Sequence, residues 1–160
     1  MLKPYENADF HLLQKWITDA DLMFQFAGTT WQFPLTQEAL DAFAMANPNR
    51  FAYIGLDDEN EPYAYGEFIT GGENTPRLGR LLVGESNKRG KGFGQKFIAE
   101  LIDECVKLTA TKEIFLFVFE SNIPAIKCYE KLGFRFTEDA AFRLNYKGEE
   151  FKVLKMRLEV

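Results

Sequence analysis

VGESNKRGKGFG, residues 83–94, is a glycine-rich, basic segment that separates a predicted strand from a predicted helix. The residues before it, 78–83, are typical of a β-strand, and apolar residues recur at helical spacing over 93–108. The unbroken apolar run IFLFVF, 114–119, then predicts a central strand covered on both faces. A strand, helix and strand in this order form a parallel, right-handed unit, whose ligand site is expected at the carboxyl ends of the strands.

The turn between strand and helix has the composition of a phosphate-binding loop. Its glycines allow backbone N–H groups to converge where the helix begins, and a helix N-terminus carries about half a positive charge with several unpaired N–H donors. Lys88, Arg89 and Lys91 add mobile positive charge. The spacing matches neither GxxxxGK[ST] nor GxGxxG, which excludes a Walker loop and weakens a dinucleotide fold. A tight turn with solvated lysines is the structural alternative.

Further elements are predicted on both sides of this unit. Apolar spacing and capping residues indicate helices after Asp9, Asp19, Thr36 and Asn122, with Gly133 capping the last of these. Alternating or apolar runs predict a strand at 2–5, a hairpin of 51–56 with 63–70, and a final hairpin of 134–146 with 151–158 around Lys147-Gly148.

Composition limits the function classes. The 160 residues suit one domain, 1–160, and 46% hydrophobic with 27% charged residues fits a globular protein. A net charge of −5 gives no general attraction for nucleic acid or anionic lipid, so neither partner is expected. The only cysteines, Cys105 and Cys128, fall in predicted helices, and the lone His11 argues against a catalytic zinc site, so no metal is expected. Without a signal-peptide pattern or a run of about 18 apolar residues, we expect a cytoplasmic protein.

Two ordered motifs resemble the GNAT superfamily of N-acetyltransferases. The family's cofactor signature, Arg/Gln-x-x-Gly-x-Gly/Ala, is matched by Arg89, Gly92 and Gly94. The segment FVFESNIPAIKCYEKLGF, 117–134, is similar to its second motif, a strand followed by Asn-x-x-Ala-x-x-x-Tyr-x-x-x-Gly-Phe. Together the motifs span residues 78–134, about a third of the chain.

The resemblance implies an α/β, single-domain GNAT fold: a mixed, mostly antiparallel sheet around the parallel strand-helix-strand unit, flanked by helices. It also implies acetyl-coenzyme A as co-substrate. The residues expected to bind it are Leu81, Leu82, Val83, Lys88, Arg89, Gly90, Lys91, Gly92, Phe93, Gly94, Asn122 and Ala125. Val83 precedes Arg89 by six positions where family members commonly have five, so which of the three strand residues faces the pantetheine arm stays open.

The resemblance further implies direct attack of an amine on the thioester, with a tetrahedral oxyanion held by a strand N–H and no covalent enzyme intermediate. Tyr129 would protonate the leaving thiolate. Its reference pKa of about 10 exceeds that of a thiol, about 8.5, so its position must favour the transfer. A packed core aromatic is the alternative for Tyr129, and an N-cap role alone would explain Asn122.

A general base is expected because an alkylammonium group must lose a proton before it attacks. Glu67 is the first candidate, on a strand next to the cofactor-binding strand, although a solvated carboxylate without a catalytic role is the favoured interpretation of this residue. Glu85, Glu120 and a water chain are the other options.

The acceptor, a small-molecule or peptide amine, is not specified by the sequence. Trp31 and Phe33 suggest a substrate lid, although a hydrophobic plug between the first helices and the sheet is the alternative. A homodimer is possible through C-terminal edge strands. Two other function classes stay open: a noncatalytic acyl-coenzyme A binding or sensing module, and a structural protein in which the glycine turn is incidental.

Overall fold

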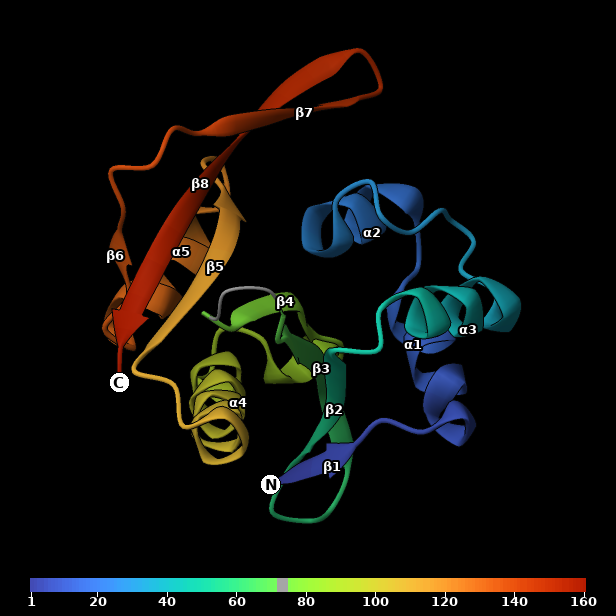
Figure 1. The fold of residues 1–160 in the computed structure, drawn as a ribbon. Helices are drawn as coiled ribbons and strands as arrows, with labels where there is room; N and C mark the ends of the chain where they lie inside the picture. The colour runs from blue at the N-terminus through green and yellow to red at the C-terminus, as the bar shows by residue number, and fades with distance from the viewer. Residues whose placement is uncertain (72–74) are drawn as a thin grey trace.

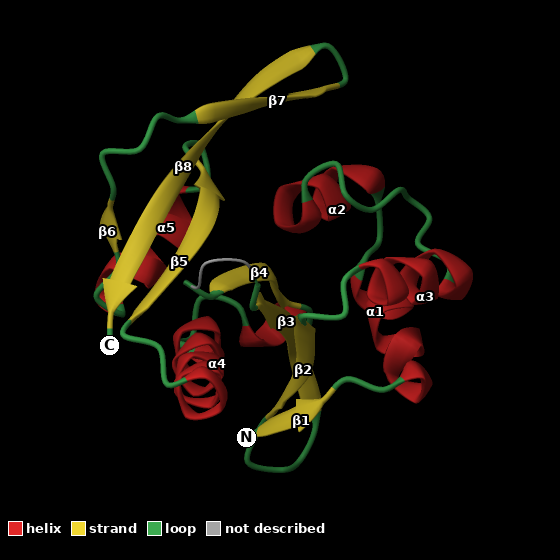
Figure 2. Ribbon diagram, viewed as in Figure 1, coloured by secondary structure: helices red, strands yellow, loops and turns green. Residues whose placement is uncertain are grey.

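The computed structural model describes residues 1–71 and 75–160, which form one twisted, mixed sheet with helices packed on it (Figure 1). The strand order is β1-β2-β3-β4-β5-β8-β6, and β7 pairs with β8 beyond this path. All neighbouring strands are antiparallel except β4 and β5, which are parallel. Figure 2 separates the helical and strand layers. The strands are β1 Leu2–Pro4, β2 Arg50–Leu56, β3 Pro62–Ile69, β4 Arg77–Val83, β5 Glu113–Phe119, β6 Arg135–Phe136, β7 Phe142–Tyr146 and β8 Glu149–Glu159.

The helices begin where the sequence supplies N-caps. They are α1 Phe10–Trp16, α2 Ala20–Ala27, α3 Gln37–Ala46, α4 Phe93–Thr109 and α5 Ile123–Lys131, with single 3-10 turns at Asn7–Asp9 and Ser86–Lys88. The Thr36 hydroxyl accepts a hydrogen bond from Ala39 N at 3.2 Å, which satisfies an N–H group that the first turn of α3 leaves unpaired. Asp9 differs from the prediction, because its carboxylate accepts from Glu6 N and Lys3 Nζ instead of capping α1.

Two cores lie on opposite faces of the β1–β4 half of the sheet. α1 and α3 pack with Ile54, Tyr65 and Leu82 on one face, whereas α4 packs with Tyr63 and Phe68 on the other. In Figure 1, α1–α3 accordingly lie together on one side of β2 and β3, and α4 lies on the opposite side. The amphipathic spacing over 93–108 therefore gives a helix whose apolar face is buried, as predicted.

The pairing of β3 with β4 contains a β-bulge. Tyr65 pairs with Leu82 and Glu67 pairs with Gly79, so Arg80 and Leu81 together face Gly66. Arg80 has φ +49°, a left-handed conformation that is uncommon for a residue with a side chain. The bulge lies before Val83, so it does not account for the spacing between Val83 and Arg89, where the chain instead forms the 3-10 turn Ser86–Lys88.

The parallel pair β4 and β5 is short. Only Arg77 with Phe115 and Leu78 with Leu116 are paired, and the two strands diverge beyond these residues toward their carboxyl ends (Figure 1). The space between the diverging strands is not covered by backbone hydrogen bonds, and it becomes the central cleft of the molecule.

Two predictions on the C-terminal half are wrong. β5 is not covered on both faces, because Phe117 is 36% exposed and alternates with buried Leu116 and Val118. The predicted strand 134–146 is broken into β6 and β7, which pair with different parts of β8, although the hairpin turn at Lys147-Gly148 is confirmed. The helix before them ends at Lys131 with Leu132 as its cap, and Gly133 follows at φ +99°.

Candidate functional site

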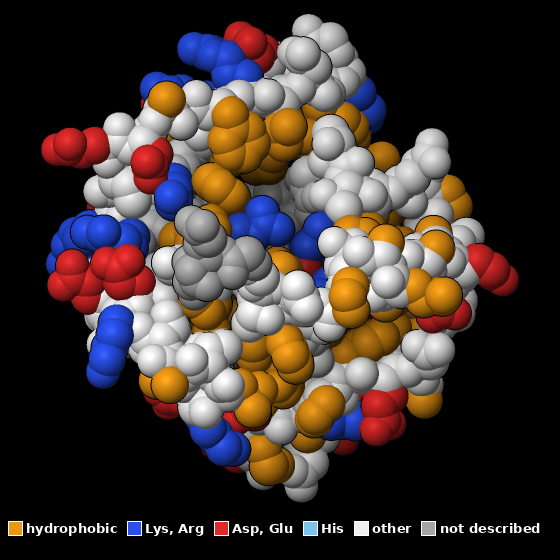
Figure 3. All heavy atoms as spheres, viewed as in Figure 1, with side chains coloured by type: hydrophobic (Ala, Val, Ile, Leu, Met, Phe, Trp, Pro, Cys, Tyr) orange, Lys and Arg blue, Asp and Glu red, His pale blue; other side chains and the backbone are white. Residues whose placement is uncertain are grey.

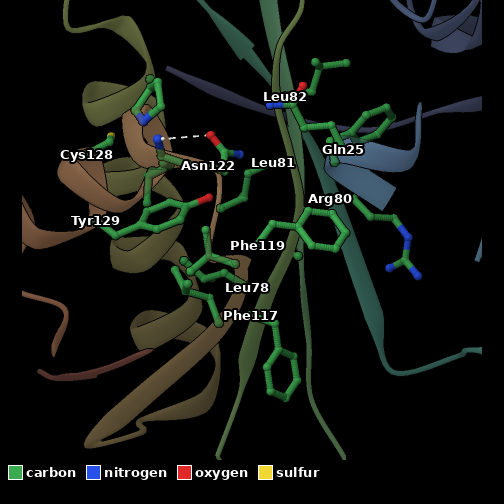
Figure 4. A pocket seen from close by; sticks show the side chains of 18 of the residues that line it. Gln25, Leu78, Arg80, Leu81, Leu82, Phe117, Phe119, Asn122, Cys128 and Tyr129 are labelled. Atoms are coloured by element: carbon green, nitrogen blue, oxygen red, sulfur yellow. Dashed lines mark hydrogen bonds between the residues drawn. The ribbon is translucent and has the colours of Figure 1, made fainter. Parts of the chain in front are cut away.

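A cavity of about 800 Å³ opens between the diverging strands β4 and β5. Its walls come from both strands, α2, α5, the turn before α4 and the β7–β8 hairpin. Figure 4 shows residues from several of these elements pointing into the same space. The sequence placed the ligand site at the carboxyl ends of the parallel strands, and this is where the cavity lies.

The glycine turn forms one end of this cavity. Gly90 has φ +71° and Gly92 has φ +85°, and a Cβ added to either residue would meet no atom within 4 Å. Within the described part of the chain, no group accepts a hydrogen bond from the N–H of Gly90, Gly92 or Gly94. Unpaired N–H donors beside open space at the N-terminus of a 17-residue helix are the arrangement that binds a phosphate group, so the turn fits a pyrophosphate.

Arg89 fastens this turn to the end of β4. Its Nε donates to Val83 O at 2.8 Å and its Nη2 donates to Gly84 O at 3.2 Å. Arg89 also lines the cavity, so its charge is available at the same end as the open N–H groups. The side chain therefore has a structural role as well as the expected binding role.

Two other residues of the turn, Lys88 and Phe93, make contacts away from the cavity. Lys88 forms an ion pair with Asp57 at 2.7 Å, and its Nζ lies 4.6 Å from the centre of the Phe93 ring. Phe93 packs edge-on against Tyr63, with ring centres 5.2 Å apart. Lys88, Lys91 and Phe93 are not among the residues that line the cavity, so the structure does not bring these three expected cofactor residues to it.

The expected strand residues Leu81, Leu82 and Val83 all border the cavity through some of their atoms. Their side chains divide between the two cores: Leu82 packs with the α1–α3 core, and Leu81 and Val83 pack against the α4 core. These three residues therefore border the cavity while their side chains also pack on the two faces of the sheet.

Tyr129 lies on α5 with its ring between the core and the cavity. It is 8% exposed, and in Figure 4 its hydroxyl points toward Leu81 on β4. Burial raises the pKa of the Tyr129 phenol above its usual value, which keeps the hydroxyl protonated at neutral pH. The raised pKa also makes the phenol a weaker acid toward a thiolate, so its position beside the cleft must favour the proton transfer. Asn122 and Ala125 line the same wall, and Asn122 Oδ1 accepts from Ala125 N at 3.4 Å as the N-cap of α5 (Figure 4).

Glu67 is not the solvated carboxylate that the sequence suggested. It is completely buried, and its two oxygens accept hydrogen bonds from Arg50 Nε and Arg80 Nη1, with Tyr65 OH donating at 3.2 Å. It is also absent from the residues that line the cavity. A role as general base stays a prediction, and its contacts favour a different role, which is to hold two buried arginines.

We expect Glu67→Gln to lower the free energy of unfolding by about 3 kcal/mol, because it removes the charge that compensates Arg50 and Arg80. Denaturant unfolding would measure the change. Glu120→Gln is the matched control, since Glu120 is exposed and pairs only with the surface Lys152, and it should change stability little. If instead Glu67→Gln leaves stability intact and removes the acid limb of the pH–rate profile, Glu67 is the base.

The other candidate bases are engaged or peripheral. Glu85 accepts hydrogen bonds from Lys15 Nζ and, at 3.0 Å, from Trp16 Nε1, which ties α1 to the segment after β4. The Trp16 ring also lies against Gly84, where an added Cβ would come within 2.0 Å of it. Glu120 follows β5 at the surface. Neither residue borders the cavity.

The expected substrate lid is not formed by Trp31. This residue is 6% exposed and packs against the rings of Phe26, Phe43 and Tyr65, so the alternative of a hydrophobic plug is the correct one. Phe33 is 39% exposed but does not border the cavity. The wall near α2 is formed instead by residues such as Gln25, Phe26 and Thr30.

Arg77, Arg80 and Phe119 are among the cavity residues that were not predicted from the sequence. Phe119 could have been found, because it ends the apolar strand whose carboxyl end was predicted to border the ligand. No local sequence pattern predicts that the two arginines line the cavity, because their position depends on the β-bulge and on the divergence of β4 from β5.

Known proteins share this sequence pattern and fold. The model of the acetyltransferase (GNAT) family matches residues 14–134. A spermine/spermidine N(1)-acetyltransferase of Bacillus subtilis is 35% identical over 79 residues, which is 49% of this chain and 49% of that protein. The chain therefore spans about half the length of the curated relatives it matches.

Two solved structures illustrate the likeness in fold. Spermidine N-acetyltransferase from Vibrio cholerae, in complex with CoA and spermine, superimposes with a TM-score of 0.83 at 16% identity, covering 99% of this chain and 94% of that one. Ribosomal-protein-alanine N-acetyltransferase from Brucella melitensis gives 0.76 at 17% identity, covering 100% and 99%. At these identities the likeness concerns the fold alone.

No helix of the described residues is long and apolar enough to cross a membrane. No three His, Cys, Asp or Glu side chains of these residues cluster as metal ligands would. Cys105 and Cys128 are both free thiols. Because the family model covers most of the chain, and both motifs lie where the cavity is built, the chain belongs to the acetyltransferase (GNAT) family.

Proposed function

We propose that the protein is an N-acyltransferase that moves an acetyl group from acetyl-coenzyme A to a primary amine. The observation that carries this proposal is a single cavity with two complementary ends. Open N–H groups of the glycine turn lie at one end, and the buried hydroxyl of Tyr129 borders the adjoining wall. The first suits a pyrophosphate and the second suits the thiol that departs when a thioester is cleaved.

Each of these groups has a defined task in the reaction. Acetyl-coenzyme A, when bound, supplies a thioester carbonyl carbon. Backbone N–H groups at Gly90 to Gly94 and the Arg89 guanidinium hold the pyrophosphate, which fixes the position of the thioester arm along β4. The new bond joins the amine nitrogen to the carbonyl carbon, and the carbon–sulfur bond breaks. Tyr129 gives its proton to the sulfur, the nitrogen of the attacking neutral amine loses one proton to water or to a base, and Tyr129 then regains a proton from solvent.

The acceptor is proposed to be a small-molecule or peptide amine. The curated relatives are named for spermine and spermidine, which are polyamines with primary amino groups, and this supports amine chemistry without specifying the acceptor. We also propose that residues 1–160 act as one domain. A cytoplasmic location and a possible homodimer stay predictions from the sequence.

The direct test is a thermal melt with and without excess acetyl-coenzyme A, followed by an assay of thiol release with a panel of amines. A ligand at about 100 times its Kd adds about 2.7 kcal/mol, which should raise Tm by about 5–10 °C for a domain of this size. Thiol release that depends on an amine would support transfer. A melting shift without turnover on any amine would favour the noncatalytic binding module, and no shift would reject the site.

A further inference from the structure

The cavity has a pronounced excess of positive charge. Its lining includes the cations Arg77, Arg80, Arg89, Lys127 and Lys131. No Asp or Glu of the described residues lines it. Figure 3 shows Lys or Arg side chains inside the hollow that β4, α2 and the β7–β8 hairpin surround in Figure 1. The protein as a whole is acidic, with a net charge of −5, so this excess is local.

The cations form two groups at separate positions along β4. Arg89 lies in the turn after the carboxyl end of the strand, at the end proposed for the pyrophosphate, and Lys127 and Lys131 line the cavity from α5. Arg77 and Arg80 lie in the first half of β4, on the other side of Leu81. A pyrophosphate at the turn does not account for this second pair.

Arg77 is a partly buried cation without a carboxylate partner among the described residues. Its guanidinium carbon lies 5.7 Å from the centre of the Phe117 ring, which is exposed on the opposite wall of the cavity. Burial, and then the nearby charge of Arg80, lower the pKa of Arg77 from its usual value. Both effects would be relieved by an anion placed beside it.

Arg80 is held in position by its surroundings. It pairs with buried Glu67, and its guanidinium carbon lies 4.5 Å from the centre of the Phe43 ring and 5.3 Å from that of Trp31. Its left-handed backbone at the bulge costs about 1–3 kcal/mol, a strain that is found more often at functional sites than elsewhere. Glu67 pairs with both Arg50 and Arg80, so one carboxylate faces two arginines there, and it forms no ion pair with Arg77 in the described structure.

We infer that the acceptor amine carries a carboxylate, as a free amino acid does, and that Arg77 with Arg80 binds this carboxylate. This inference rests on the proposed function and specifies its substrate class. Arginine binds carboxylates with two parallel hydrogen bonds, which orients the acceptor so that its amine is presented to the thioester. A polyamine, which carries only positive charges, would be repelled by the same pair and would find no acidic partner among the described lining residues.

The test compares amines in matched pairs that differ only by the carboxylate. Lysine with cadaverine, ornithine with putrescine, and phenylalanine with phenethylamine form such pairs, and spermidine is added as a polycation. We expect at least one amino acid to be acetylated with a kcat/KM about tenfold or more above that of its decarboxylated partner, since a hydrogen bond to a charged group contributes that much.

Arg77→Gln provides the second arm, because Arg77 makes no ion pair in the described structure and its loss should leave folding intact. The variant should raise KM for the preferred amino acid about tenfold to a hundredfold and leave its decarboxylated partner unchanged. Arg143→Gln is the matched control, since Arg143 is exposed and pairs only with exposed Glu150, and it should change neither value.

The outcomes distinguish a failure of the inferred acceptor class from a failure of the proposed acyltransferase activity. Preference for spermidine or for the decarboxylated amines, with cofactor binding intact, would overturn the inference and leave the acyltransferase proposal standing. An equal KM of wild type and Arg77→Gln for the amino acid would also overturn it. No acetylation of any amine would overturn the proposed function, and this inference with it.

Discussion

Gly92→Asp is expected to abolish the stabilisation by acetyl-coenzyme A, a loss of about 2.7 kcal/mol at a hundredfold excess over Kd. Gly92 lies at φ +85° beside open space at the N-terminus of α4. An aspartate there would place a carboxylate where the N–H groups converge, and it would repel a pyrophosphate from the cradle. The difference in Tm with and without ligand measures the effect.

Gly148→Asp is the matched control. Gly148 also has a positive φ, +77°, with no atom near an added Cβ, but it lies in the turn between β7 and β8. Both variants should lose a similar amount of stability without ligand, because both place a side chain in a left-handed conformation. Gly148→Asp should retain the full response to the ligand. If Gly92→Asp also retains it, the turn does not bind the pyrophosphate.

Tyr129→Phe is expected to lower kcat by about 10²–10⁴-fold while cofactor binding is unchanged, because general acid catalysis contributes about that much. The variant removes one oxygen and leaves the ring that packs against Phe134, with centres 6.0 Å apart. Steady-state kinetics with saturating amine give kcat, and the melting shift reports binding separately.

Tyr53→Phe tests whether the loss is specific to the cavity. Tyr53 belongs to the same core as Tyr129 and is similarly buried, but it does not border the cavity. The Tyr53→Phe variant should therefore keep the kcat of the wild type. A Tyr129→Phe variant with full kcat would exclude the phenol as the acid, whereas an equal loss in both variants would indicate a general effect on packing.

Local sequence features were sufficient for much of the fold. Helical spacing, the caps Thr36 and Asn122, and the turn at Lys147-Gly148 involve neighbours within a few residues, and the structure contains each of them. Two ordered motifs predicted the parallel pair of strands and a ligand site at their carboxyl ends, where the cavity lies. The glycine turn and Tyr129 could be predicted as site residues because each belongs to a motif of residues that are close together in the sequence.

The rest depends on contacts between distant segments. Glu67 was expected in solvent because strand alternation does not reveal which partners lie across the sheet, and Arg50 and Arg80 reach it from both neighbouring strands. Lys88 was expected at the cofactor, but Asp57 in the β2–β3 turn attracts it away. Trp31 suggested a lid because it is an aromatic residue in a loop, and only its packing against α3 shows that it is the buried plug given as the alternative.

The short pairing of β4 with β5 has a consequence for how such a protein can change over time. The gap beyond Leu78 and Leu116 leaves main-chain groups unpaired. Every residue carries a C=O group, and every residue except proline carries an N–H group. Binding of acetyl-coenzyme A through these main-chain groups therefore changes little with most substitutions along β4. The side chains near the start of β4 can vary without affecting these main-chain groups. The acceptor specificity can therefore change while the binding of acetyl-coenzyme A is kept.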